Sequence, residues 1–216
     1  MPSVVIVGAS RGIGREFARQ YAADGWQVFA TVRETGTTID GATVLTADVT
    51  DEASLTAMAK GLPAIDLLIL NAGLGNREPG LAGIEAVKWT EVMATNALGP
   101  MLAARALLPR LCDGATIAAL SSTLGSIGAN SGGGLYTYRM SKAALNAGLK
   151  TLSIELKGRG IVVTALHPGW VKTAMGGAGA EVTVDASVSG MRGVIAGLTP
   201  ATSGTFYDYR GNAMPW

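Results

Sequence analysis

Tyr138 and Lys142 are the residues whose types and spacing first indicate chemistry. They stand four residues apart in the stretch LYTYRMSK, at 135–142, and on a helix that spacing places both side chains on one face. A tyrosine beside a lysine is a candidate acid for protonating a carbonyl oxygen, because a nearby ammonium favours the phenolate and lowers the pKa of the phenol. The same spacing occurs by chance in many helices, so the pair needs support from the rest of the chain.

A glycine-rich turn near the amino terminus predicts a dinucleotide site. The β-branched run at 3–7 is typical of a buried parallel strand, and it leads through Gly8, Gly12 and Gly14 into an amphipathic stretch at 15–23. Glycines permit a tight turn and close backbone approach, and a helix N-terminus offers free N–H groups to a pyrophosphate. The spacing G-x-x-x-G-x-G differs from G-x-G-x-x-G, and an ordinary tight turn is the alternative.

The end of the second predicted strand, at 26–32, favours NADP over NAD. Val32 lies eighteen residues after Gly14, where an NAD site would need a carboxylate for the ribose, and Arg33 follows it. Without that carboxylate nothing repels a 2′-phosphate, and the forked donors of Arg33, together with Arg11 in the glycine turn, suit one. Either arginine alone could equally be a solvated surface charge.

Strand and helix patterns alternate along the whole chain. Further strands are predicted at 43–47, 65–70, 115–120 and 161–166, an edge strand at 204–207, and helices from about 51, at 85–111 with an interruption near 99–100, at 136–156 and at 184–198. This alternation predicts an α/β fold, with a doubly wound parallel sheet of about seven strands and helices on both faces. The expected organisation is one NAD(P)-binding, Rossmann-like domain at 1–216.

Composition narrows the function classes. Of 216 residues, 48% are hydrophobic, 15% are charged and 30 residues are glycine, as expected of a buried sheet under helices. A net charge of +1 gives no indication of nucleic-acid or anionic membrane partners. No apolar run is long enough to span a bilayer, and one histidine with one cysteine (Cys112) cannot form a typical metal site or an internal disulfide. Cytoplasmic residence is therefore expected.

The motifs stand in one order: the glycine turn, Asn71-Ala72-Gly73, Ser122, the Tyr138/Lys142 pair and Pro168-Gly169. This ordered set resembles the short-chain dehydrogenase/reductase family over nearly the whole chain. The stretches SSTLGSIG, GGGLYTYRMSKAALN, HPGWVKTAMGG and GNAMPW resemble the subgroup that contains the Sniffer carbonyl reductases and the C-factor-like proteins.

The resemblance implies a four-residue catalytic set. Tyr138 would protonate the carbonyl oxygen, Lys142 would lower the pKa of the tyrosine and hold the nicotinamide ribose, and Ser122 would orient the carbonyl. Asn96 would anchor a water chain behind Lys142. The chemistry agrees with this division, because hydride addition builds negative charge on oxygen and needs donors that are already in place there.

The choice of serine stays open in the sequence. Many family members place it thirteen residues before the tyrosine, but position 125 is glycine here, and Ser122 lies sixteen residues upstream. Ser122 is preferred because it opens Ser-x-x-Gly directly after the fifth predicted strand. Ser121 is the second choice and Ser126 a distant third.

The implied cofactor site extends along the chain. Asp48 could accept a hydrogen bond from an adenine amino group, or could only cap the helix that follows. Thr173 matches the family position that binds the nicotinamide carboxamide. The expected cofactor-binding residues are Gly8, Ser10, Arg11, Gly12, Ile13, Gly14, Arg33, Asp48, Val49, Asn71, Ala72, Gly73, Tyr138, Lys142, Pro168, Gly169, Val171 and Thr173.

The sequence thus predicts an oxidoreductase that moves a hydride between NADP(H) and a small aldehyde, ketone or alcohol. The alternative is a nucleotide-binding signalling or regulatory protein with little turnover. A homodimer or homotetramer could pair through helices near 97–111 and 137–157, whose alanines could also face the sheet. His167 is expected to be structural; Trp170 flanks the substrate or packs in the core; Trp216 docks near the substrate mouth or at a subunit contact.

Overall fold

The computed structural model describes residues 1–216 and contains a seven-stranded sheet in which every paired strand is parallel. The strands are β1 (Ser3–Val7), β2 (Gln27–Val32), β3 (Ala42–Thr46), β4 (Ile65–Leu70), β5 (Leu111–Leu120), β6 (Val162–His167) and β7 (Thr205–Asp208). Their order in space is β3-β2-β1-β4-β5-β6-β7. The order reverses between β1 and β4, and open parallel sheets bind ligands at such a switch point, beyond the carboxyl ends of the strands.

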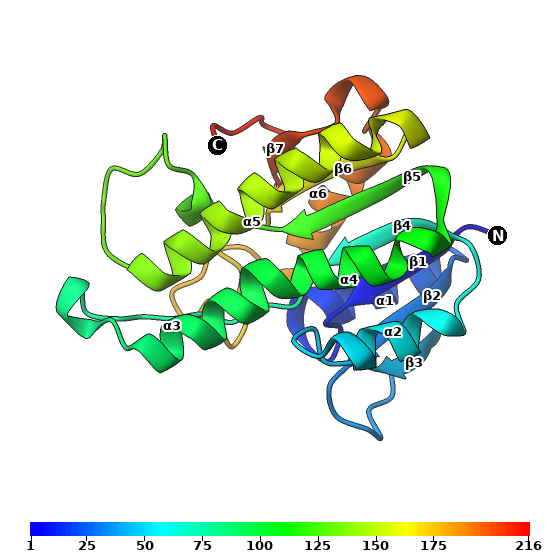
Figure 1. Cartoon of the computed structure of the whole chain (residues 1–216), viewed down its shortest axis with the longest axis horizontal. Coiled ribbons are helices and arrows are strands. Elements are labelled where there is room, and N and C mark those ends of the chain that lie inside the picture. Colours follow the sequence, from blue (N-terminus) through cyan, green and yellow to red (C-terminus); the bar gives the residue numbers. More distant parts are fainter.

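Helices cover both faces of this sheet, as Figure 1 shows. The helices are α1 (Gly12–Ala23), α2 (Glu52–Lys60), α3 (Ala86–Met93), α4 (Gly99–Leu107), α5 (Tyr136–Glu155) and α6 (Val184–Ala196). Residues of α2, α4 and α5 share one buried cluster with the sheet, and residues of α1 and α6 share the other. The predicted single, doubly wound sheet with helices on both faces is therefore confirmed.

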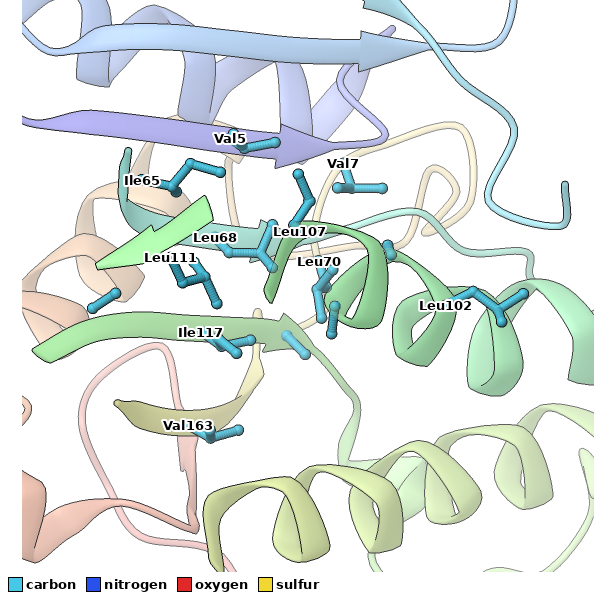
Figure 2. Close-up of a cluster of buried hydrophobic side chains, with 14 of the residues drawn as sticks. Val5, Val7, Ile65, Leu68, Leu70, Leu102, Leu107, Leu111, Ile117 and Val163 are labelled. Atoms are coloured by element: carbon cyan, nitrogen blue, oxygen red, sulfur yellow. The ribbon is translucent and has the colours of Figure 1, made fainter. Parts of the chain in front are cut away.

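The strand β1 shows why both faces are apolar. Val5 and Val7 join the cluster under α2, α4 and α5, whereas Val4 and Ile6 join the cluster under α1 and α6. Successive strand residues point to opposite faces, so a strand that is buried on both sides reads as a continuous apolar run. Figure 2 shows the first cluster, in which Leu107 of α4 lies among the side chains of β1 and β4.

The helical stretch predicted at 85–111 extends over 86–110, but its interruption lies at 94–98 instead of near 99–100. Helix α3 passes into a π-helical segment, Ala94–Leu98, before α4 begins, and β5 already starts at Leu111. Pro100 explains the shift, because proline lacks an N–H and its ring clashes with the carbonyl four residues upstream, which belongs to Asn96. A π-helical turn relieves that clash, and such turns are frequent at functional sites.

No helix combines the length and the apolar composition that a membrane span requires. No three His, Cys, Asp or Glu side chains are grouped so that they could hold a metal ion. Cys112 is partly buried and packs against the larger core cluster.

Candidate active site

The glycine turn crosses from β1 to α1 at the switch point of the sheet. A Cβ on Gly8 would lie 2.7 Å from Cα of Ala72, and a Cβ on Gly14 would lie 2.2 Å from the Gly8 carbonyl oxygen. No side chain fits at either position. The Val7 carbonyl also accepts from the N–H groups of Asn71 and Ala72, at 3.0 and 2.8 Å. The turn and the segment after β4 thus form one closely packed backbone surface.

The N-terminus of α1 is open to an anion. Arg11 occupies the N-cap position without a side-chain cap, and the first turn contains no acidic residue. Unpaired N–H groups and the helix dipole make such a terminus a phosphate site. Arg11 and Arg33 are both exposed, and neither takes part in an ion pair.

Asp48 lies near Arg33 and does not cap the following helix. Hydrogen bonds from Thr50 and, more weakly, the charge of Arg33 lower the pKa of the Asp48 carboxyl. The cap of α2 is Asp51, whose Oδ1 accepts from Ala53 N and Ser54 N at 2.9 and 3.2 Å. The helix-cap interpretation of Asp48 is therefore wrong, and its role toward adenine stays a prediction.

The three candidate serines after β5 differ in their hydrogen-bond partners. Ser121 Oγ donates to Asn146 Oδ1 at 2.6 Å, and Ser126 Oγ donates to the Trp216 carbonyl at 3.3 Å. Ser122 Oγ accepts from Leu124 N at 3.1 Å, and its own proton is not taken by a backbone carbonyl or an amide oxygen, unlike those of Ser126 and Ser121. Ser122 also faces the phenol of Tyr138. The geometry favours Ser122 over both alternatives.

Gly125 shows why no serine stands at the position thirteen residues before the tyrosine. A Cβ there would lie 2.7 Å from Cβ of Lys142 and 2.8 Å from its carbonyl carbon. Helix α5 therefore passes too close for any side chain at 125, and the serine has to come from nearer the end of β5.

Lys142 is a buried cation without a carboxylate partner. Its side chain is 5% exposed overall, and Nζ donates to the Leu120 carbonyl at 2.7 Å. An ammonium has three N–H donors, so two remain free for a ligand. Burial lowers the pKa of Lys142 to about 8. Its Nζ lies 5.9 Å from the centroid of the Tyr138 ring.

The pKa of Tyr138 moves in the direction opposite to the sequence-based expectation. Burial raises the pKa of this phenol, and the Ser122 hydroxyl lowers it only in part. The expected net lowering is wrong, because desolvation of the phenol outweighs any stabilisation of the phenolate by the Lys142 ammonium, which lies 5.9 Å from the ring centroid and donates to the Leu120 carbonyl. Tyr138 is therefore protonated at neutral pH, as a proton donor must be.

Asn96 lies in the π-helical segment and is fully buried. Its Oδ1 accepts from Leu74 N at 2.7 Å, and its Nδ2 donates to the Leu74 carbonyl at 2.8 Å and to Ser141 Oγ at 3.0 Å. A Cβ on Gly73 would lie 3.4 Å from Asn96 Oδ1 and 3.6 Å from Lys142 Nζ. Asn96 thus fastens the segment after β4 to α5, a link through Ser141 that the sequence did not indicate. A water chain stays a prediction.

The segment after β6 reaches back to the glycine turn. Gly169 has φ +83°, and Thr173 Cγ2 would lie 3.4 Å from a Cβ on Gly12. Arg77 Nη2 donates to the Met175 carbonyl at 3.2 Å, so the segment after β4 also holds this one. The motifs expected to bind the cofactor at Gly8–Gly14, Asn71–Gly73 and Pro168–Thr173 thus adjoin one another at the carboxyl edge of the sheet.

Three aromatic or imidazole side chains complete the surroundings. Trp170 is 54% exposed, so the core-packing alternative is wrong for it. Trp216 stacks on Phe206 with ring centroids 5.6 Å apart, and its carbonyl accepts from Gly128 N at 3.1 Å. The end of the chain therefore packs on the loop between Ser122 and Tyr138. Burial lowers the pKa of His167 to about 4, and its structural role stays a prediction.

Comparison with known proteins identifies the family of the chain. The family model described as short chain dehydrogenase matches residues 2–182. The C-signal protein of Myxococcus xanthus is 44% identical over 154 residues, which cover 70% of this chain and 93% of that protein.

Two solved structures are similar over the whole chain. An NADPH-bound carbonyl reductase from chicken fatty liver is 34% identical with a TM-score of 0.92, covering 100% of this chain and 99% of that one. The carbonyl reductase Sniffer of Drosophila melanogaster is 28% identical with a TM-score of 0.91, covering 100% of both chains. The chain belongs to the short-chain dehydrogenase family.

Proposed function

We propose that this protein is an NADPH-dependent carbonyl reductase that acts on small, uncharged aldehydes or ketones. The observation that carries this function is the hydroxyl of Ser122 facing the protonated phenol of Tyr138, with the buried Lys142 behind them. Two O–H donors that converge on one point are what a carbonyl oxygen needs when it gains negative charge.

The residues around this point fit NADP(H). The backbone surface of Gly8 and Gly14 excludes side chains, the α1 terminus has free N–H groups, and Lys142 has two N–H donors without a protein acceptor. Arg11 and Arg33 would hold a 2′-phosphate, and Lys142 would hold ribose hydroxyls. When bound, the reduced nicotinamide supplies the hydride. The chicken liver enzyme, similar over the whole chain, is described with NADPH bound.

The side chains of this protein supply position and a proton. Ser122 and Tyr138 donate hydrogen bonds to the carbonyl oxygen and so orient it. As negative charge develops on that oxygen, Tyr138 transfers its phenolic proton and becomes a phenolate. Lys142, 5.9 Å from the ring centroid, stabilises the phenolate by its charge until a proton returns.

The exposed surface near the site favours an apolar substrate. Trp170 and Met175, on the segment after β6, are 54% and 48% exposed. A panel of aliphatic aldehydes, aromatic ketones, dicarbonyl compounds and keto acids, followed by loss of NADPH absorbance, tests the function. Uncharged members should react with kcat/KM at least about tenfold above the keto acids, because a buried unpaired carboxylate is costly.

A regulatory nucleotide-binding protein is the second candidate, and the C-signal relative supports it. That function predicts tight NADPH binding and no consumption on any member of the panel. The catalytic function is favoured, because a binder has no use for a serine hydroxyl facing a tyrosine. A panel without turnover, on protein shown to bind NADPH, would reverse this preference.

Several expectations from the sequence remain predictions. They include one functional domain at 1–216, a cytoplasmic location and assembly into dimers or tetramers. Ala144 and Ala147 are exposed on α5 and therefore do not face the sheet. Helix α5 could thus pair with a second copy of the chain, and analytical ultracentrifugation would measure the oligomeric state.

A further inference from the structure

The helix that carries the proposed proton donor has no cap of its own. Its N-cap residue, Leu135, has φ 49° and ψ 43° without a side-chain cap, and it is the only non-glycine residue with positive φ. Gly133 and Gly134 before it also have positive φ, 60° and 65°. Tyr138 is the third residue of this helix. A glycine-rich entry cannot fix the first turn, so something else must hold it.

A buried carboxylate from the segment after β4 takes that place. Glu78 is 8% exposed, and its Oε1 accepts from the backbone N–H of Thr137 at 2.6 Å. Its Oε2 accepts from Asn76 Nδ2. The contact joins residues 59 positions apart in the chain, which is why the sequence gives no indication of it.

The surroundings of Glu78 show that few other interactions offset the cost of burying its carboxylate. No ion pair includes Glu78. Arg139, close by in sequence to Thr137, donates instead to the carbonyls of Gly133 and Gly134, at 3.1 and 3.0 Å. A buried carboxylate without a cation is costly, and here only Asn76, the N–H of Thr137 and the positive end of the helix dipole offset that cost.

The segment that carries Glu78 is itself firmly held. Asn96 binds both backbone groups of Leu74, and Arg77 binds the Met175 carbonyl. Glu78 therefore presents its carboxylate from a fixed backbone rather than from a free loop.

We propose that Glu78 is a positioning residue that fixes the first turn of α5 and thereby holds the Tyr138 phenol against Ser122. Its effect on turnover rests on the proposed reductase function, whereas its effect on the helix and on the phenol does not. Because burial raises the pKa of Tyr138 and Ser122 lowers it, a phenol that leaves this position has a different pKa.

The test uses Glu78→Ala, Glu78→Gln and a control, Asp66→Ala. Gln keeps an acceptor for Thr137 N, and the Asn76 amide can turn to satisfy the new NH₂ group. Asp66 accepts from Ser3 N at 2.8 Å at the opposite, amino end of the strands, so its loss removes a carboxylate–backbone bond far from the site. If Glu78→Ala does not fold, Glu78→Asp takes its place, because the shorter side chain moves the carboxylate away from the Thr137 N–H and keeps the charge.

Three measurements are made on the full chain. Hydrogen exchange should rise at least about tenfold at 136–139 in Glu78→Ala and stay near wild type in Glu78→Gln and Asp66→Ala. The ¹³C resonance of the Tyr138 phenol, assigned with Tyr138→Phe, should titrate at a pH different from that of the wild type in Glu78→Ala alone. With a carbonyl substrate, kcat should fall between about tenfold and a hundredfold, while the NADPH Kd is unchanged and Gln restores kcat.

Two results overturn the inference. Unchanged exchange at the start of α5 in Glu78→Ala, or in Glu78→Asp if the first variant is unfolded, shows that Glu78 does not hold the helix. Faster exchange with an unchanged Tyr138 titration shows that it holds the helix without positioning the phenol. Absence of turnover in the wild type would contradict the reductase function instead, since exchange and the titration still decide the role of Glu78.

Discussion

The Lys142 ammonium donates a hydrogen bond to the Leu120 carbonyl, 2.7 Å away, and so ties α5 to the last residue of β5. Ser121 and Ser122 follow Leu120 directly. One contact therefore joins the element that carries the tyrosine to the element that carries the serine. Burial has the largest effect on the pKa of Tyr138 and raises it.

The two neighbouring serines should respond differently to the same change. Ser122→Ala removes a donor to the carbonyl oxygen and should lower kcat by about a hundredfold to a thousandfold. The loss of the bond from Leu124 N should also lower the free energy of unfolding by about 0.5–2 kcal/mol. Ser121→Ala leaves Asn146 without its buried donor and should lower the free energy of unfolding by about 1–3 kcal/mol with kcat near wild type. Steady-state kinetics and urea unfolding of both variants check this. Equal losses of kcat would contradict the choice of Ser122.

Gly125 should not tolerate a side chain. Gly125→Ser places a Cβ 2.7 Å from Lys142 Cβ, so α5 must move, and the free energy of unfolding should fall by about 1–3 kcal/mol. Gly132→Ser is the matched control, because the nearest atom to a Cβ there is Arg139 Nη2 at 4.0 Å; it should change stability by less than about 0.5 kcal/mol. Chemical denaturation measures both. A stable, active Gly125→Ser variant would show that the helix can give way.

Most of the fold was predictable because its signals are local. Apolar runs that end at glycine or polar residues predicted all seven strands, and each boundary fell within one residue except that of β5, which begins at Leu111. The helical stretch predicted at 85–111 was found to within one residue at each end, but its π-helical turn at Ala94–Leu98 was missed, because the apolar pattern continues through that turn. That turn arises from a clash between Pro100 and the carbonyl of Asn96, and periodicity does not register such a clash.

The candidate site was predictable only as a set of motifs. The order of the motifs indicated which residues meet at the edge of the sheet. The choice among Ser121, Ser122 and Ser126 required their hydrogen-bond partners, two of which, Asn146 and Trp216, lie 25 and 90 residues away. Burial, which sets the pKa of Tyr138 and Lys142, is likewise a property of the whole fold.

His167 should make the protein sensitive to acid. Burial lowers its pKa from 6.5 to about 4, so the folded state binds this proton less readily than the unfolded state. Stability is then lost as pH falls from about 6.5 toward 4, by about 1–2 kcal/mol between pH 7 and pH 5. Urea unfolding at a series of pH values measures the loss. His167→Asn should flatten this part of the curve, and an unchanged slope in that variant would assign the acid sensitivity to other groups.

The two exposed arginines should distinguish NADPH from NADH. If Arg33 binds a 2′-phosphate, a charged hydrogen bond of about 1.5–3 kcal/mol makes NADPH bind at least about tenfold tighter than NADH. Arg33→Ala should remove that difference and leave NADH binding unchanged. Arg105→Ala removes the same charge from a surface ion pair with Glu52 and should have no effect. Tryptophan fluorescence titration checks all three proteins; equal binding of both cofactors by the wild type would mean that the NADP preference is wrong.

The most direct test of the central claim is NADPH oxidation by Tyr138→Phe with a carbonyl that the wild type reduces. The variant keeps the ring and loses only the phenolic proton, so kcat should fall by about a hundredfold to ten-thousandfold. The Kd for NADPH should stay within about twofold, because Lys142 and the glycine turn are unchanged. Wild-type turnover by Tyr138→Phe would contradict the assignment of Tyr138 as the proton donor.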